Sequence, residues 1–177
     1  MKIFVSCSSS DEISEEYKIV SKYLFEEISK DNDLVFGCTN RGLMGLCYNA
    51  FFQNKRKIYG VCNEMYKEDL KDLNIDETMY VNSFEEANII FGEISDLILI
   101  LPGAFGTLSE FIDLLEEKRV GIHNKDIIIF NINGFYDDLI NMFNKIYNQV
   151  SKKYDFNSLC KVFTTSDETI EYIKKSN

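Results

Sequence analysis

Residues 97–110 have the sequence LILILPGAFGTLSE, which joins the most apolar run of the chain to a turn with two glycines and a helical pattern. The apolar residues 97–101 are typical of a parallel strand that helices cover on both faces. Pro102, the only proline of the chain, ends this run. The stretch therefore predicts a strand, a tight turn and a helix in direct succession.

The same alternation of apolar runs and helical patterns extends along the whole chain. For example, Leu108, Phe111, Ile112 and Leu115 recur at the spacing of one helix face. Strands that alternate with helices are typical of a parallel, doubly wound sheet, so we predict an α/β fold with helices on both faces. No linker or change of composition divides the chain, and we expect one domain over residues 1–177. The other strands are expected at residues 2–5, 34–36, 57–61, 79–81, 126–131 and 161–163, and a further helix at 42–53.

The composition is that of a folded, acidic protein. Hydrophobic residues make up 45% of the 177 residues and charged residues 27%, which argues against disorder. With 19 Lys and Arg against 29 Asp and Glu, the formal net charge is −10, so we expect no binding to nucleic acid. Arginine occurs only at Arg41, Arg56 and Arg119. A bound anion would therefore have to be held mostly by backbone amides.

Cysteine and histidine are distributed in a way that argues against several kinds of site. The five cysteines form no C-x-x-C pair and His123 is the only histidine, which disfavours zinc and a Ser-His-Asp mechanism. We predict no metal, no cofactor and reduced thiols, as in a cytoplasmic protein. The apolar start of the chain is too short for a signal peptide, and the longest uncharged stretch, residues 97–109, is too short for a membrane span. We therefore expect no membrane partner.

Ligands of doubly wound sheets bind beyond the carboxyl ends of the strands, where three turns of this chain are candidates. The first turn is SCSSS at residues 6–10. The hydroxyls of Ser8 and Ser9 either hold a phosphate or sugar hydroxyl, or simply cap a helix that opens at Asp11. The second turn is FGCTNRGLMG at residues 36–45, which is neither G-x-G-x-x-G nor a Walker motif. It either receives an anion at a helix start or has glycines only for backbone geometry.

The third turn, PGAFGTLSE at residues 102–110, is the sharpest candidate because two glycines allow a close approach of the backbone to a ligand. We expect its helix to begin at Thr107, with free N–H groups that suit a phosphate. Alternatively, Thr107 and Glu110 form a capping box, T-x-x-E, and only cap the helix. The local sequence favours neither alternative.

Taken together, these motifs resemble the LOG ("Lonely guy") family of cytokinin-activating nucleoside 5′-monophosphate phosphoribohydrolases. Residues 102–110 are similar to the family signature P-G-G-x-G-T-x-x-E, and GLMG at residues 42–45 is similar to its second motif. Residues 7–9, 121–125 and 131–136 also look like family segments, in the same order. The resemblance implies a Rossmann-like fold, a homodimer or larger homo-oligomer, and cleavage of a nucleotide into free base and ribose 5-phosphate. The older label of these proteins, lysine decarboxylase, has no support here, since no lysine is placed as a pyridoxal-phosphate Schiff base.

The resemblance also implies roles for individual residues. Glu110 is the expected catalytic carboxylate, because a negative charge beside C1′ stabilises an oxocarbenium-like ribose and orients the attacking water. The 5′-phosphate is expected at the glycine turns, where helix amides supply binding energy that positions the ribose. The expected phosphate- and substrate-binding residues are Ser8, Ser9, Gly37, Gly42, Met44, Gly45, Pro102, Gly103, Gly106 and Thr107.

One family feature is missing from the chain. The family carries an Arg-Lys pair on the helix before the Pro-Gly strand, and counting back from Pro102 places Ala87 and Asn88 there. Ala87 lies on an apolar helix face, so this position is interpreted as packing. We name Arg41 as the candidate replacement for the catalytic arginine, with Arg119 as the alternative. The simpler interpretation of both is a solvated surface arginine.

Two functions therefore stay open. The first is a divergent phosphoribohydrolase with Glu110 as its catalytic group. The second is a protein that binds a nucleotide or cofactor without turnover, like the molybdenum-cofactor carrier proteins, which look like this fold. The absent Arg-Lys pair favours the binding protein, whereas the retained Glu110 favours the enzyme.

Overall fold

The computed structural model describes residues 1–150 and 155–177. Its strands are β1 (Lys2–Ser6), β2 (Asp33–Phe36), β3 (Ile58–Asn63), β4 (Glu77–Val81), β5 (Leu97–Ile100), β6 (Asp126–Phe130) and β7 (Lys161–Phe163). They form one seven-stranded sheet in the order β4-β3-β2-β1-β5-β6-β7, and every neighbouring pair is parallel. This order confirms the predicted doubly wound sheet.

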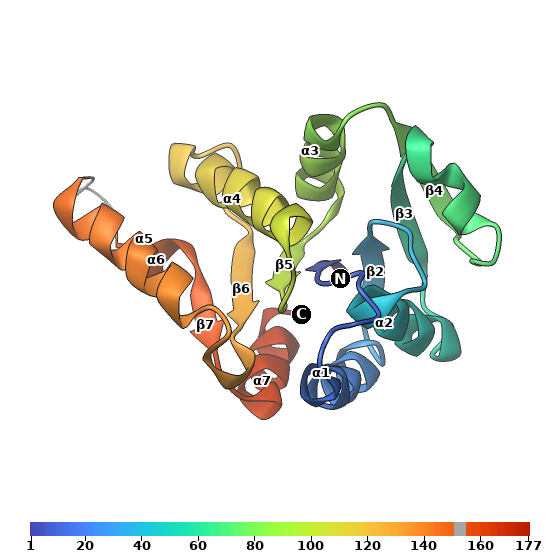
Figure 1. The fold of residues 1–177 in the computed structure, drawn as a ribbon, viewed down its shortest axis with the longest axis horizontal. Coiled ribbons are helices and arrows are strands. Elements are labelled where there is room, and N and C mark those ends of the chain that lie inside the picture. Colours follow the sequence, from blue (N-terminus) through green and yellow to red (C-terminus); the bar gives the residue numbers. More distant parts are fainter. Residues whose placement is uncertain (151–154) are drawn as a thin grey trace.

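Helices cover both faces of the sheet, as Figure 1 shows. One face carries α1 (Glu15–Ile28), α2 (Gly42–Gln53) and α7 (Ser166–Ser176). The other face carries α3 (Phe84–Ile94), α4 (Phe105–Val120), α5 (Asp137–Gln149) and α6 (Phe156–Leu159). Two short 3-10 helices, η1 (Glu64–Leu70) and η2 (Ile132–Gly134), follow β3 and β6.

Alternate residues of the central strands contribute to two separate cores. In β1, Ile3 and Val5 pack with the helices α1, α2 and α7, whereas Phe4 packs with α3 and α4. Because side chains alternate along a strand, Ser6 lies on the same face as Phe4. The last residue of β1 is therefore directed toward the face that α4 covers.

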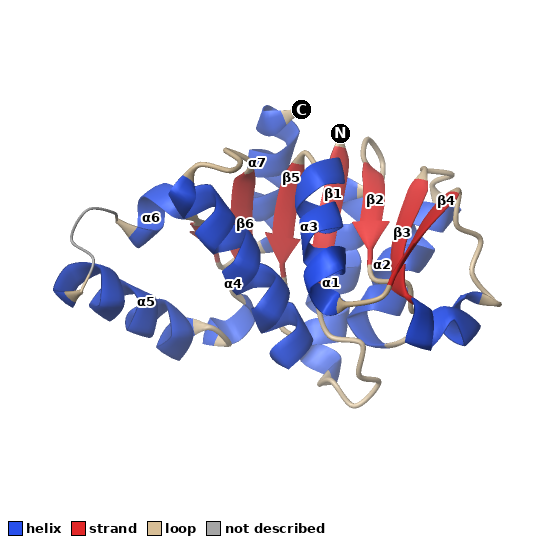
Figure 2. Cartoon of the chain, turned by 90° about the horizontal axis from the view of Figure 1, so that it is seen from above, coloured by secondary structure: helices blue, strands red, loops and turns tan. Residues whose placement is uncertain are grey.

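The two halves of the sheet meet at β1 and β5. The backbone N–H of Leu101 donates to the Ser6 carbonyl at 2.9 Å, and that of Ser8 donates to the Pro102 carbonyl at 3.0 Å. The turns that follow the two strands therefore lie together at the edge to which the arrowheads point in Figure 2. This is the topological switch point of the sheet, the usual position of ligands in such folds.

Each expected strand coincides with an observed one, but two helices begin elsewhere than predicted. α1 begins at Glu15 instead of near Asp11, and α4 begins at Phe105 instead of Thr107. The 3-10 helix η1 was not predicted, because its sequence EMYKEDL has no clear apolar periodicity. None of the helices in the two described ranges combines the length and the apolar character that a membrane crossing requires.

Candidate active site

Glu110 lies on the second turn of α4, on the side of the helix that faces the sheet. Thr107 and Leu114, which lie one turn before and after it on this side, are buried. Ser6, the last residue of β1, is 2% exposed and donates its hydroxyl to Oε2 of Glu110. The carboxyl group is thereby held at the carboxyl ends of the central strands.

Burial dominates the protonation of Glu110. It raises the pKa of this carboxyl to about 7, while the Ser6 hydrogen bond acts in the opposite direction by favouring the ionised form. Burial, and after it the charge of Glu110, raises the pKa of the Cys7 thiol. Burial also raises the pKa of the nearby Tyr136 phenol. At pH 7, Cys7 and Tyr136 are therefore neutral, and Glu110 is the group that titrates.

Tyr136 fastens the turn that follows β5. Its phenol O–H donates to the Leu101 carbonyl at 2.8 Å, and the Gly103 backbone acts to lower its pKa. Asn131 holds the tyrosine in place, since its Oδ1 accepts from the Tyr136 amide at 2.7 Å. Residues 131–136, which follow the carboxyl end of β6, therefore hold the Pro-Gly turn in position.

The N-terminus of α4 is open. Ala104 is its N-cap and supplies no side-chain hydrogen bond, so the amides of Phe105, Gly106 and Thr107 point out of the helix without a helical acceptor. A Cβ at Gly106 would meet nothing within 4 Å, and the Phe105 side chain is 90% exposed. Free amides at the positive end of a helix are a general anion-binding arrangement.

The capping box that we considered for this turn is wrong. Thr107 is the third residue of α4 rather than its N-cap, and the Glu110 carboxyl is bonded to Ser6 rather than to the Thr107 amide. The Thr107 side chain packs instead against Gly103, where a Cβ would lie 2.2 Å from its Oγ1. A glycine is therefore required at position 103 for the turn to close.

At the N-terminus of α2, by contrast, groups of the preceding loop accept hydrogen bonds from the first amides. The Gly42 amide donates to Oδ1 of Asp11 at 2.9 Å, and the amides of Leu43 and Met44 donate to the Ser8 carbonyl at 2.9 and 3.2 Å. Gly42 has a φ of +56°, and a Cβ there would lie 2.7 Å from the Ser8 carbonyl oxygen. The second turn is thus packed against the first, and its leading amides already have acceptors.

The remaining predicted site residues lie around these turns. Ser9 is exposed on the loop before α1, whose N-cap is Ser14, so the expected capping role of the serine turn is wrong. Arg41 is exposed and forms an ion pair with Asp11, with 3.3 Å between Nε and Oδ2. Two further glycines of this region are Gly37 and Gly45. A Cβ added at either would lie close to atoms of neighbouring residues.

Neutral residues occupy the place of the family's Arg-Lys pair. Ala87 is buried in the core between α3 and α4, which confirms its interpretation as packing. Asn88 is 5% exposed, and its Nδ2 donates to Oδ2 of Asp113 at 2.5 Å. Arg119, the alternative cation, is paired with Glu116 near the far end of α4. Burial and Ser6, rather than a cation, thus set the pKa of the catalytic candidate.

The candidate site also includes Ser6 and Tyr136, which were not predicted from the sequence. For Ser6 a signal existed, because it lies two residues after the buried Phe4 and hence on the same face of its strand. Tyr136 lies in a segment that resembles the family, but its bond to the Leu101 carbonyl depends on how β6 and β5 lie side by side.

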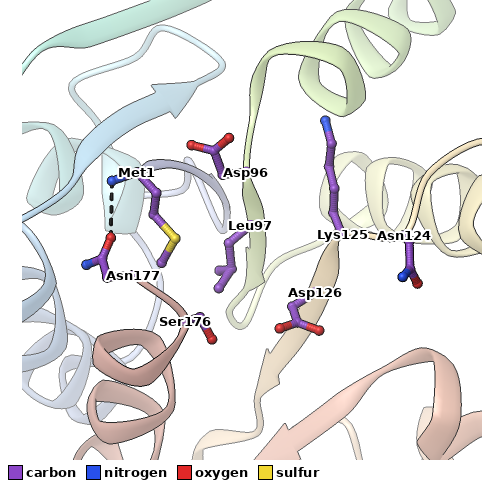
Figure 3. A pocket seen from close by; sticks show the side chains of 8 residues that line it. All are labelled: Met1, Asp96, Leu97, Asn124, Lys125, Asp126, Ser176 and Asn177. Carbon is purple, nitrogen blue, oxygen red and sulfur yellow. Dashed lines mark hydrogen bonds between the residues drawn. The ribbon is translucent and has the colours of Figure 1, made fainter.

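A pocket at the opposite edge of the sheet contains none of the predicted site residues (Figure 3). It lies at the amino ends of β5 and β6, where the Met1 amino group donates to Oδ1 of Asn177 at 3.2 Å. Its lining residues are Met1, Asp96, Leu97, Asn124, Lys125, Asp126, Ser176 and Asn177. Within the described ranges, no three His, Cys, Asp or Glu side chains are grouped to hold a metal ion. We therefore assign the candidate site to the edge of the sheet formed by the carboxyl ends of the strands, where parallel sheets bind ligands.

Solved structures share the whole fold. The molybdenum cofactor carrier protein MCP from Chlamydomonas reinhardtii has a TM-score of 0.72 at 15% identity, over 99% of this chain and 96% of that chain. The molybdenum cofactor binding protein from Rippkaea orientalis has a TM-score of 0.68 at 19% identity, over 98% and 95%. Identities this low show a common fold and leave the function open.

Proteins that are similar in sequence indicate the family, which the structural neighbours do not. Residues 44–173 match the family described as possible lysine decarboxylase. The chain is 30% identical over 146 residues to the cytokinin riboside 5′-monophosphate phosphoribohydrolase LOG1 of Arabidopsis thaliana, covering 81% of this chain and 68% of the relative. It is 25% identical over 176 residues to the probable cytokinin riboside 5′-monophosphate phosphoribohydrolase LOGL2 of Oryza sativa subsp. japonica, covering 98% and 72%. The match of the family and the extent of these identities place the chain in the LOG family.

Proposed function

We propose that this protein hydrolyses the N-glycosidic bond of a nucleoside 5′-monophosphate and releases the free base and ribose 5-phosphate. One juxtaposition supports the proposal: the largely buried Glu110 carboxyl lies about one turn along α4 from the open N-terminus of the same helix. A turn of helix rises about 5.4 Å, which suits a ligand with its phosphate at one end and its reacting carbon near Glu110. Membership of the LOG family supports the same reaction.

The phosphate in this proposal binds the amides of Phe105, Gly106 and Thr107. The positive end of the α4 dipole offsets the acidic charge of the protein locally, so a single nucleotide is attracted although a polynucleotide is not. Ser8 and Ser9 add hydroxyls from the adjoining turn. Binding energy gained at the phosphate positions the ribose for the reaction at C1′.

Glu110 acts in its ionised form. As the bond from C1′ to the base breaks, its electron pair leaves with the base, and the carboxylate stabilises the positive charge that develops on the ribose. Water, oriented by the same carboxylate, then attacks C1′ as its proton passes to the carboxylate, and this proton finally neutralises the departed base. Because burial raises the pKa of Glu110 to about 7, the ionised fraction increases with pH around neutrality. Base release is expected to rise with pH and to level off above about pH 8.

Arg41 is the proposed replacement for the missing family arginine. It is exposed and paired with Asp11, and exposed ion pairs contribute little to stability. A bound phosphate can therefore compete with Asp11 for the guanidinium and draw it toward the substrate. Without a fixed cation at position 87 the reaction is expected to be slower than in a protein that keeps the Arg-Lys pair.

The neutral side chains of Ala87 and Asn88 favour a second candidate function. A protein that binds a nucleotide or cofactor without turnover needs the anion site at α4 but no cation beside the reacting bond. The fold likeness to molybdenum cofactor carriers is compatible with this candidate and does not discriminate between the two.

Incubation with AMP, GMP, CMP and a cytokinin riboside 5′-monophosphate separates the two functions. Free base is measured by chromatography and nucleotide binding by calorimetry. A hydrolase releases base from at least one of them and loses this activity in Glu110→Gln, which keeps the shape of the side chain. Nucleotide binding without release of any base contradicts the hydrolase and supports the binding protein. Arg41→Ala should lower kcat more than it lowers affinity, and an unchanged kcat excludes Arg41 as the replacement cation.

We also propose that the protein acts as a homodimer or larger homo-oligomer in the cytoplasm. Light scattering on the purified protein tests the first part. The second is supported by the cysteines, which are all buried and form no disulfide bond within the described residues.

A further inference from the structure

We propose that Ser6 is a positioning residue, which holds the Glu110 carboxylate at the candidate site by donating its hydroxyl to Oε2. The inference rests on the proposed function, since an oriented carboxylate matters for catalysis only if Glu110 acts on a substrate. It concerns a residue of the first turn whose partner lies on a helix 104 positions later.

The backbone of Ser6 is fixed on both sides. Ser6 ends β1, and its partner in the parallel register is Ile100, at the end of β5. Its carbonyl accepts from the Leu101 amide at 2.9 Å, and its side chain is almost completely buried. A donor anchored in two central strands restricts a carboxylate more than a donor on a surface loop can, because β1 and β5 are each paired with a strand on both sides.

The other groups around the carboxyl group do not stabilise its charge. Cys7 from the end of β1 and Tyr136 from the start of α5 are neutral, and the Glu110 charge contributes to raising the pKa of both. On α3, which packs against α4, the neutral Asn88 is bonded to Asp113, one turn further along α4 than Glu110. The Ser6 hydroxyl is the interaction that favours the ionised Glu110 against burial. Among the described residues, no group forms a hydrogen bond with Oε1, so in the proposed function this oxygen is available to the substrate.

Loss of the hydroxyl therefore has a specific consequence. In Ser6→Ala the carboxylate stays buried but loses its donor, so protonation becomes easier and the pKa of Glu110 rises further. A hydrogen bond to a charged group is typically worth enough to move the acidic limb of the pH–rate profile upward by about one pH unit. For a limb that moves from about pH 7 to about pH 8, kcat/KM falls about fivefold at pH 7 and recovers by about pH 9. KM is expected to change less than about twofold, because the phosphate contacts are untouched.

The experiment compares wild type, Ser6→Ala, Ser6→Thr and Ser21→Ala. Ser6→Thr keeps a hydroxyl, whereas Ser21→Ala removes another fully buried hydroxyl, one that has no hydrogen-bond partner among the described residues. The first readout is the pKa of Glu110, obtained by following the 13C NMR signal of its carboxyl carbon as the pH changes. The signal is assigned by its absence in Glu110→Gln. The second is the pH–rate profile of base release.

Ser6 is supported as a positioning residue if Ser6→Ala shifts both the titration and the limb while Ser6→Thr and Ser21→Ala leave them near wild type. An unshifted titration in Ser6→Ala, or the same shift in Ser21→Ala, overturns the proposal. The titration needs no turnover, so a wild type that releases no base refutes the proposed function without obscuring the result on Ser6. If Ser6→Ala does not fold, Ser6→Cys replaces the oxygen with a weaker donor of similar size and gives the same comparison.

Discussion

The N-termini of α2 and α4 look alike in sequence, since each follows a strand and each has glycines in the turn before or at the helix start. In the structure, the two termini differ in which groups accept hydrogen bonds from their first backbone amides. The loop before α1 fills the α2 terminus with the Asp11 carboxylate and the Ser8 carbonyl. At the α4 terminus, whose N-cap Ala104 supplies no side-chain hydrogen bond, the first amides have no acceptor among the described residues, about one turn before Glu110.

The difference shows that a glycine-bearing turn has two distinct uses. At Gly42 the absent side chain makes room for the neighbouring loop, so the glycine serves the fold. At Gly106 an added Cβ would meet nothing within 4 Å, which leaves room for the proposed phosphate. We therefore expect substitutions at the α4 terminus to impair function with little loss of stability, and substitutions at the α2 terminus to do the reverse.

The largest expected effect follows from Glu110→Gln at the α4 side. Base release should fall at least about 10²-fold, because the charge that stabilises the ribose is lost. Stability should increase, because the folded pKa of about 7 lies above the ordinary value of 4.5, so wild type loses stability as the pH rises from about 4.5 to 7. The gain above pH 7 is about 3 kcal/mol and is measurable by urea unfolding. Glu116→Gln, an exposed change on the same helix, is the matched control, and an equal loss of activity in both variants would contradict the role of Glu110.

At the α2 side, Gly42→Ala should destabilise the protein by about 2–4 kcal/mol. The backbone has a φ of +56°, and the added Cβ would lie 2.7 Å from backbone atoms of the serine turn. Urea unfolding measures the loss, with Gly106→Ala as the control in open space. Comparable destabilisation by the two substitutions would remove the distinction between the turns.

Gly106→Val tests the open terminus directly. A β-branched side chain at the first turn of α4 would cover the amides, so nucleotide affinity should fall about tenfold or more by calorimetry. Circular dichroism should show a folded protein, because nothing lies within 4 Å of the added Cβ. Unchanged affinity would mean that the phosphate binds elsewhere.

The smallest effect is expected for Asp11→Asn. The Gly42 amide, and after it Arg41, lowers the pKa of the Asp11 carboxyl. The carboxylate therefore stabilises the fold above its ordinary pKa of about 4, and this contribution is lost as the pH falls through the lower folded value. The variant should have a slightly lower Tm than wild type at pH 7 and the same Tm near pH 2. A difference that grows toward low pH would show that Asp11 does not act through its charge.

Prediction from sequence succeeded where the signal was local. The apolar runs located every strand, and the helix at residues 42–53 has the predicted bounds. It failed at the starts of α1 and α4. Asp11 and the residue after it look like the acidic first turn of a helix, but the Asp11 side chain is bonded to Gly42, and α1 begins only at Glu15.

By itself the sequence determined the alternation of strands and helices, the position of the glycine turns and the absence of basic residues at positions 87 and 88, because each is a property of neighbouring residues. Only the tertiary structure decided which helix terminus is open, and that Ser6 faces Glu110. Both depend on contacts between segments far apart in the chain, which are set by the order of strands in the sheet. Local propensity carries no information about such contacts, since they form only when β1 and β5 lie side by side.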